Sequence, residues 1–266
     1  MNESPNKTGP IKKGGSRRWW LPISINRRLV LDGLYFAQRV PLYPIEMSFD
    51  LSDVAELRQQ AQRRISWAAI FIKAYAITAE QHRPLRQAYI RWPWPHIIEE
   101  AQSTAMVVVN RQYLNEDRIC WGKLKTPELR PLAALQEDLD SYQSEPVETI
   151  FYRQVLFSKL PTPLRRLIYW WNLNLAGDRR AKRLGTFTMS TLAGQGVMNR
   201  MHQSFLTSSL TYGPLDENGH AVVTLLCDHR VIDGIVAARA LADLEAALHG
   251  AIREELQSLA AARAAA

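Results

Sequence analysis

The sequence predicts an α/β domain in which a mixed sheet is flanked by helices, in the manner of a two-layer sandwich. Three observations lead to this prediction. Runs rich in β-branched and apolar residues, such as MVVVNRQY (106–113) and AVVTLLC (221–227), have the composition of strands. Runs with helical periodicity separate them, and the longest, 234–250, directly follows a predicted strand. The 266 residues, 47% of them hydrophobic, suit one large domain with a packed core.

The sequence of the N-terminal half predicts a disordered arm that is followed by helices and strands. Residues 1–21 are polar and basic, and we expect a disordered arm there, with one folded domain at 22–266. Then follow a helix at 25–40, a strand within 41–52 whose apolar residues alternate, and helices from Ser52–Asp53 and over 67–82. Two strands, 106–113 and 118–124, lie on either side of a turn at 115–117.

The C-terminal half continues the pattern. The stretch Thr126-Pro127-Glu128 has the features of a helix start, and Leu129, Leu132, Leu135 and Leu139 follow it on one helical face. The remaining predicted elements are helices at 148–158 and 162–176, strands at 186–192, 205–213 and 221–227, and a final helix from near Asp233. A hairpin turn at 216–219 joins the last two strands.

The charge of +7, from 33 Lys and Arg against 26 Asp and Glu, is spread in short clusters. It suits an anionic partner, such as a phosphate-bearing cofactor or carrier or a membrane surface. No nucleic-acid motif accompanies it, so we expect no nucleic-acid partner. We also find no run long enough to span a bilayer and no signal peptide, and therefore expect a cytoplasmic protein. The two cysteines, Cys120 and Cys227, suggest neither a disulfide framework nor a metal site, and Cys227 is expected to be a small core residue.

The stretch CDHRVIDG (227–234) places His229, Asp233 and Gly234 between a predicted strand and a predicted helix. Such junctions often present reactive side chains, so His229 is either catalytic or a local structural residue. His229 and Asp233, four positions apart, could also be two metal ligands on one helical face. That interpretation needs a third ligand, which nothing nearby in the sequence supplies, so we expect no metal.

Three stretches, in order, are similar to a known family. LLCDHRVIDGIVAARALADLEAAL resembles the active-site segment of the acyltransferase core of 2-oxo-acid dehydrogenase complexes, the dihydrolipoamide acyltransferases, and of the related chloramphenicol acetyltransferases. GTFTMSTLAG (185–194) is similar to the family's Gly-x-Phe-Thr-x-Ser strand and turn. Residues 25–60 and 66–89 resemble its N-terminal paired-arginine helix, strand and following helix. The resemblance covers about 22–250 and implies the chloramphenicol acetyltransferase-like fold, with 22–266 as an acyltransferase catalytic domain.

The resemblance also implies roles for individual residues. His229 would be the general base, and Ser190 would stabilise the oxyanion. Asp233 would hold the loop through a salt bridge to an N-terminal arginine, Arg28 or, less favoured, Arg27. In addition, Gly234 would let the backbone turn tightly into the helix.

The family implies a homotrimer, or a larger assembly, with the active site between subunits and direct transfer in a ternary complex. It implies no tightly bound cofactor. Because residues 1–21 are too short for a lipoyl domain, we expect acyl-coenzyme A or an acyl carrier protein as donor, and a hydroxyl, amine or thiol as acceptor, in lipid or secondary-metabolite synthesis. Two alternatives remain: a non-catalytic scaffold of the same fold, and the core of a 2-oxo-acid dehydrogenase complex whose lipoyl domains are on another chain.

Residues 145–183 depart from the family, in which this segment is shorter and more polar. One helical face here carries Leu164, Leu167, Ile168, Trp171 and Leu175, with arginines on either side. An apolar face of this kind either packs on the core or binds an acyl chain or lipid near an anionic membrane.

Overall fold

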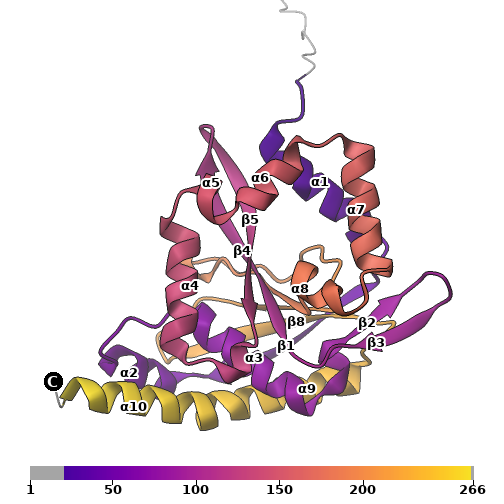
Figure 1. The fold of residues 1–266 in the computed structure, drawn as a ribbon. Coiled ribbons are helices and arrows are strands. Elements are labelled where there is room, and N and C mark those ends of the chain that lie inside the picture. Colours follow the sequence, from indigo (N-terminus) through magenta and orange to yellow (C-terminus); the bar gives the residue numbers. More distant parts are fainter. Residues whose placement is uncertain (1–20, 265–266) are drawn as a thin grey trace, which may run out of the picture.

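The computed structural model describes residues 21–264, without the side chains of Asp178 and 262–264, and the predicted arm at 1–21 lies almost wholly outside the described residues. A six-stranded sheet forms one layer and helices form the other (Figure 1), which confirms the predicted fold class. In spatial order the strands are β1 (Leu42–Asp50), β8 (His220–Asp228), β7 (Ser208–Tyr212), β6 (Phe187–Met189), β4 (Thr104–Tyr113) and β5 (Glu116–Lys125).

The sheet is mixed because β6, near its centre, runs parallel to both β4 and β7. The other neighbours are antiparallel. The carboxyl ends of β6 and β7 therefore lie at one edge of the sheet, and the carboxyl end of β8 lies at the opposite edge. This difference in direction decides where the residues that follow β6 and β8 can act.

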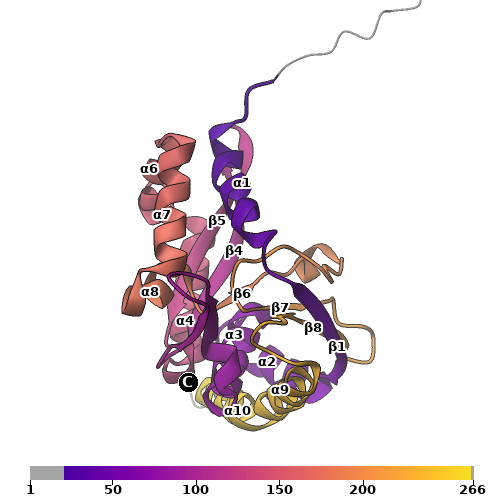
Figure 2. The ribbon, with the colours of Figure 1, turned by 90° about the vertical axis from the view of Figure 1, so that its right-hand side faces the viewer.

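The helices fall into two groups, which Figures 1 and 2 show from perpendicular directions. The helices α2 (Ser52–Gln60), α3 (Trp67–Gln81), α9 (Gly234–Ala247) and α10 (Arg253–Ala264) cover one face of the sheet. Five others lie around the long β4–β5 hairpin or toward its far end: α1 (Ile25–Ala37), α4 (Leu132–Ser144), α5 (Val147–Ile150), α6 (Tyr152–Lys159) and α7 (Thr162–Asn174). The short α8 (Arg180–Leu184) leads into β6. None of the helices in the described part of the chain is long and apolar enough to cross a membrane.

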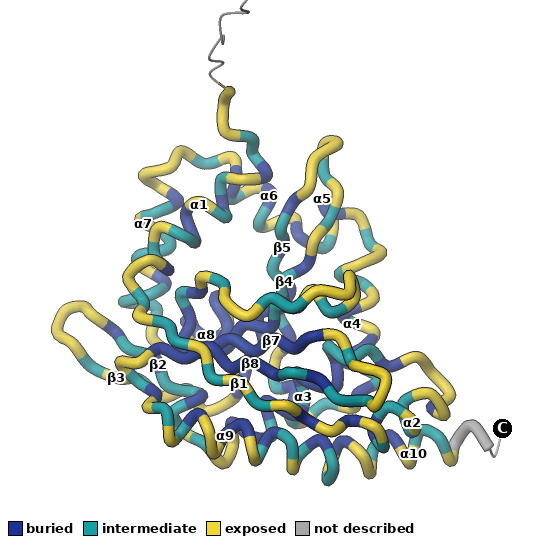
Figure 3. The backbone as a smooth tube through the Cα atoms, turned by 180° about the vertical axis from the view of Figure 1, so that it is seen from behind, coloured by how far each residue is buried: buried dark blue, intermediate teal, exposed yellow. Residues whose placement is uncertain are grey.

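The main core lies between the sheet and the first group of helices. Helix α3 is buried on most sides, as its sequence predicts, and the Ser66 hydroxyl caps it by accepting a hydrogen bond from the backbone N–H of Ala69 (3.2 Å). Strand β7 is buried throughout, and β8 is buried over its last six residues (Figure 3). The hairpin turn predicted at 216–219 joins them, with Gly219 at a φ of +84°.

The prediction that a helix starts at Thr126 is wrong, because the helix begins six residues later. Only a 3₁₀ turn (Pro127–Leu129) follows Thr126, and α4 begins at Leu132. Pro131 explains the shift, because a proline inside the first turns would remove a backbone hydrogen bond and clash with the preceding turn. At the N-cap of α4 it causes neither problem. Leu129 is consequently 68% exposed, whereas Leu132, Leu135 and Leu139 face the core as predicted.

A second, two-stranded sheet had no counterpart in the sequence prediction. It consists of β2 (Gln87–Ile90) and β3 (His96–Glu99), paired antiparallel, and the five residues RWPWP (91–95) form the tip of the hairpin. Four-residue strands are too short to reveal alternation, and the two prolines argue against a strand in any window that includes them.

Helix α7 presents only part of its predicted apolar face outward, because Ile168 and Leu175 are half-buried, so the interpretation that this face packs on the core is wrong for the rest of it. Its inward face carries Arg165, which forms an ion pair with Asp32 of α1 (Nε–Oδ2 2.5 Å), and both side chains are buried. Tyr169 lies on the same side and contacts Phe36 and Phe205. Three large side chains on the other face are 43–58% exposed: Leu164, Leu167 and Trp171. The buried ion pair fixes the rotation of α7, and the stripe therefore faces away from α1.

Candidate functional site

Ser190 lies directly after β6, where the sequence resemblance places it. Its backbone N–H donates to the carbonyl of Leu210 (3.2 Å), which extends the pairing of β6 with β7 by one residue. The strand begins after Gly185, whose φ is +92° and where a Cβ atom would lie 3.1 Å from the Thr104 carbonyl oxygen. A residue with a side chain would be strained there, so this glycine allows β6 to approach β4.

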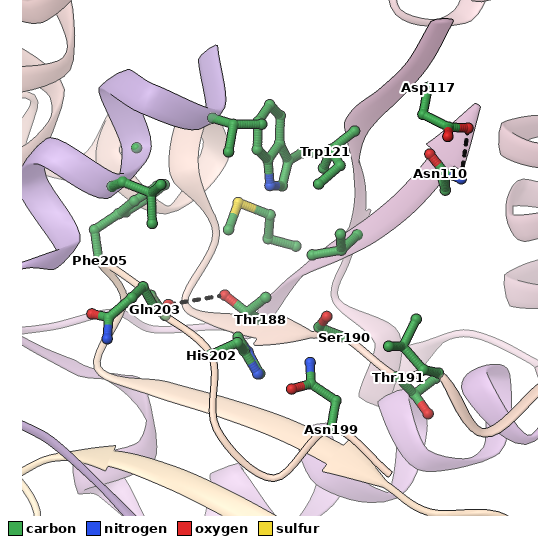
Figure 4. A pocket seen from close by; sticks show the side chains of 18 of the residues that line it. Asn110, Asp117, Trp121, Thr188, Ser190, Thr191, Asn199, His202, Gln203 and Phe205 are labelled. Atoms are coloured by element: carbon green, nitrogen blue, oxygen red, sulfur yellow. Dashed lines mark hydrogen bonds between the residues drawn. The ribbon is translucent and has the colours of Figure 1, made fainter. Parts of the chain in front are cut away.

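The Ser190 side chain lines a cavity of about 950 Å³ between α1, the β4–β5 hairpin and the loop over residues 190–205 (Figure 4). One wall is apolar, with contributions from Val30, Leu34, Met106, Val108, Ile119, Trp121 and Phe205. Polar side chains lie across from it, namely Thr188, Ser190, Asn199, His202 and Gln203. A hydroxyl beside a large apolar hollow is an arrangement that suits an organic substrate with one polar reacting group.

His202 also lines this cavity, although no motif in the sequence marks it. Its Nε2 lies 2.7 Å from the Ser209 hydroxyl, which in turn donates to the carbonyl of Thr188 (3.3 Å). A Ser209 hydroxyl that donates to Thr188 accepts from Nε2, and in that arrangement Nδ1 carries the lone pair of a neutral ring. Nδ1 is buried and has no partner among the described residues. Burial lowers the pKa of His202, which favours the same neutral form.

His229 follows β8 at the opposite edge of the sheet. Its backbone N–H donates to the Pro41 carbonyl (3.1 Å), and its ring lies 4.6 Å from the ring of Tyr43. The Tyr43 hydroxyl donates to the Ile232 carbonyl (3.0 Å) and so braces the loop. Burial, with smaller contributions from Cys227 and Asp233, raises the pKa of Tyr43 to about 12, so this donor keeps its proton. The side chain of His229 remains 59% exposed and accessible to a second molecule.

Asp233 lies beside His229, with 3.6 Å between its Oδ1 and the imidazole Nδ1. The expected salt bridge to Arg28 or Arg27 is not formed among the described residues. Arg28 instead donates to the Ser158 carbonyl (3.4 Å), and Arg27 lines the cavity. Both arginines lie at the start of α1, whose other end precedes β1 and the His229 loop. Nine or ten residues of helix separate these points by about 14 Å.

A different ion pair holds this loop. Asp228, the last residue of β8, is buried, and Arg230 reaches it with two guanidinium nitrogens, the shorter contact being 2.6 Å from Nη2 to Oδ2. The Arg230 guanidinium also lies over the Tyr89 ring, 4.4 Å from its centroid. The two residues are too close in sequence for periodicity to signal their pairing.

Gly234 does not have the role expected of it. It is the first residue of α9, it is not among the glycines with positive φ, and an added Cβ would meet only the Ile45 side chain at 3.9 Å. Alanine would fit there, so the turn into α9 does not require glycine. Cys227, by contrast, is the buried core residue expected, and burial raises its pKa to about 12, which disfavours a thiolate.

The sheet keeps Ser190 and His229 of one chain apart. Ser190 is level with Thr211 of β7, which pairs with Thr224 of β8. His229 lies five residues further along β8, so the two are separated by about 17 Å along the strands and about 10 Å across them. A base and an oxyanion donor for one reacting carbonyl must lie within a few ångströms of it. Within one chain, these two residues cannot serve the same carbonyl.

No family model and no curated protein matches the sequence. Solved structures of similar fold include a truncated catalytic core of the 2-oxoacid dehydrogenase multienzyme complex from Thermoplasma acidophilum, with TM-score 0.64 and 15% identity over 88% of this chain and 99% of that one. Dihydrolipoamide acetyltransferase from Azotobacter vinelandii gives 0.62 and 15%, over 93% and 99%. A probable dihydrolipoamide acetyltransferase from Listeria monocytogenes gives 0.61 and 15%, over 88% and 96%. These similarities confirm the predicted acyltransferase-core fold.

Proposed function

We propose that this protein is an acyltransferase that works as an assembly of copies, a homotrimer, with His229 of one copy and Ser190 of the next at a shared active site. The observation that carries the proposal is the sheet geometry. In one chain the base, His229, and the hydroxyl, Ser190, lie at opposite edges of the sheet. A contact between copies would bring the His229 of one copy to the Ser190 cavity of the next.

In the proposed reaction, His229 of one copy takes the proton from an acceptor hydroxyl, amine or thiol as that atom attacks the thioester carbonyl of the donor. The carbonyl π electrons move onto oxygen, and the Ser190 hydroxyl of the next copy donates a hydrogen bond to that oxyanion. The intermediate then collapses, the carbon–sulfur bond breaks, and the imidazolium returns its proton to the leaving thiolate. Because Nδ1 of His229 faces Asp233, Nε2 is the nitrogen available to act as base.

The structure of the Azotobacter vinelandii enzyme supports this assignment of residues. It was used to investigate a serine, a histidine and an asparagine in the mechanism of that protein, the last two being four positions apart. This chain has Ser190, His229 and Asp233 in the same order, with the same spacing between the last two. The donor we propose is acyl-coenzyme A or an acyl carrier protein, and the apolar wall of the cavity favours a bulky acceptor or a long acyl chain.

The named functions of the similar structures favour a second candidate, an acyltransferase core of a 2-oxo-acid dehydrogenase complex with dihydrolipoamide as the acceptor thiol. The two candidates share the residues and the chemistry, and they differ in the acceptor that the cavity selects.

The test is thiol release from acyl-coenzyme A thioesters of short to long chain, with dihydrolipoamide, alcohols and amines as separate acceptors. We expect acceptor-dependent release by the wild type and a loss of about 10²- to 10⁴-fold in His229→Ala. Preference for dihydrolipoamide would favour the dehydrogenase-complex core. Equal release by wild type and His229→Ala would refute acyl transfer by this site and favour a non-catalytic scaffold.

A further inference from the structure

The outward face of α7 and the tip of the β2–β3 hairpin form one exposed apolar surface. We call it the α7–hairpin surface and define it by five side chains: Leu164, Leu167, Trp171, Trp92 and Trp94. The two parts meet where Trp92 packs edge-on against Trp170 of α7, with ring centroids 5.7 Å apart. Figure 1 shows the hairpin projecting from the molecule on the side where α7 and α8 lie.

We infer that this surface docks the protein on an anionic membrane. The first argument is its composition. Trp94 is 67% exposed, Trp92 47% and Trp171 52%, although tryptophan is usually well covered in soluble proteins. Tryptophan and leucine on a projecting tip and on one face of a helix are typical of segments that enter the interface between headgroups and acyl chains.

The second argument is charge. Between 150 and 183 the chain has eight Lys or Arg residues and one Asp, and two of the eight, Arg165 and Arg180, are buried. Lys159 precedes α7, and Arg179 and Lys182 follow it. All three are exposed, and no ion pair involves them among the described residues. Each basic residue close to an anionic bilayer strengthens binding by roughly fivefold.

The third argument separates this surface from the proposed contact between copies. The inward face of α7 packs on α1 through the Arg165–Asp32 ion pair, and Val30 and Leu34 of α1 line the Ser190 cavity. The inward face of α7 also contacts the cavity wall directly, through Tyr169 and Phe205, so the cavity and the exposed stripe lie on different sides of α7. A neighbour could therefore bring His229 to the cavity without covering the stripe.

The inference does not depend on acyl transfer, because docking would occur with or without a functioning active site. Its test is co-sedimentation of the full chain with vesicles of phosphatidylcholine alone and with vesicles that contain about one third phosphatidylglycerol. We expect binding to the second kind only, and weaker binding as salt is added.

Three double variants test the individual arguments. Leu167→Ser with Trp171→Ser, and Trp92→Ser with Trp94→Ser, should each weaken vesicle binding by about tenfold or more. Lys159→Glu with Lys182→Glu should remove the preference for anionic lipid. The matched control is Leu114→Ser with Leu129→Ser, which changes two leucines of similar exposure, 66% and 68%, on other parts of the surface. Its binding should equal that of the wild type.

Light scattering of the same variants completes the test, and circular dichroism verifies that each is folded. An unchanged assembly mass with weakened vesicle binding supports membrane docking. Absence of wild-type binding to anionic vesicles would overturn the inference. Binding that the serine variants retain would do the same, as would a loss of assembly in those variants, because the surface would then be a contact between copies.

Discussion

The cavity beside Ser190 and the loop that carries His229 differ in shape, exposure and support. The cavity is a hollow of about 950 Å³ with one apolar wall, and α1 and the β4–β5 hairpin form its sides. The loop is open, and its His229 side chain is 59% exposed. The hydrogen bond from Tyr43 and the Asp228–Arg230 ion pair hold the loop in place. The cavity can hold a substrate, but its histidine, His202, is half-buried against Ser209, whereas the loop has an exposed imidazole but no enclosure. Each region has what the other lacks.

The most demanding test of this comparison mixes two inactive proteins. His229→Ala should lose about 10²- to 10⁴-fold in rate and Ser190→Ala about 10²- to 10³-fold. When the two are co-expressed and assemble at random, about a quarter of the sites would pair an intact histidine with an intact serine. We therefore expect the mixture to regain about a quarter of wild-type thiol release.

Each variant co-expressed with a second copy of itself is the control for this experiment, and it should remain inactive. Mixed assemblies that form, as mass analysis would show, and yet stay as inactive as their parents would contradict a site shared between copies.

A second test removes the buried ion pair that joins α7 to α1, the helix that forms one side of the cavity. Arg165→Leu leaves the buried carboxylate of Asp32 without its closest partner, and the free energy of unfolding should fall by about 3 kcal/mol. Arg166→Leu is the matched control, because its guanidinium lies 3.3 Å from the other oxygen of Asp32 but is 40% exposed, so its loss should cost less than about 1 kcal/mol. Chemical denaturation measures both. Equal losses would mean that the buried pair does not hold α7 on α1.

A third test measures how the contribution of His202, the histidine in the cavity, to the free energy of unfolding depends on pH. Burial lowers the pKa of His202 in the folded chain, and unfolding returns it to its ordinary value near 6.5. The unfolded state therefore takes up a proton first as pH falls. The stability that the neutral ring provides is complete above about pH 6.5 and is lost as pH falls through the folded-state pKa.

The free energy of unfolding, measured from pH 8 to 5, should thus fall less steeply in His202→Gln than in the wild type, by at most about 1.4 kcal/mol per pH unit. Gln203→Asn, a change to a neighbouring cavity residue that does not titrate, should keep the wild-type slope. Parallel curves for His202→Gln and the wild type would show that this ring has no part in acid sensitivity.

The smallest expected effect concerns the loop. Asp233 and His229 are both exposed, and water screens a pair at 3.6 Å, so Asp233→Asn should lower kcat/KM by less than about fivefold. Asp228→Asn is the informative comparison, because that carboxylate is buried against Arg230, and it should reduce stability more than Asp233→Asn does. A hundredfold loss of activity in Asp233→Asn would give Asp233 the positioning role that the sequence resemblance implies.

Much of the fold was predictable because its signals are local. The strands at β4, β5, β7 and β8 and the helices α1, α3 and α9 all occur where composition and periodicity indicate, and the turn at 216–219 is where Gly219 needs a positive φ. Ser190 and His229 were found by their short motifs, and each lies directly after the expected strand. The exceptions have local causes that windows of sequence conceal: a proline at position 131 and four-residue strands around RWPWP.

What the sequence by itself determined was which segments form strands and helices and which side chains have the chemistry for acyl transfer, since propensity and motif depend on neighbouring residues. The tertiary structure alone decided three things. Sheet order and strand direction placed Ser190 and His229 at opposite edges. Folding brought His202 against Ser209 in the cavity. The ion pair between Asp32 and Arg165, 133 positions apart, turned the apolar stripe of α7 outward. Each depends on contacts between residues distant in the chain, whose geometry no local pattern encodes.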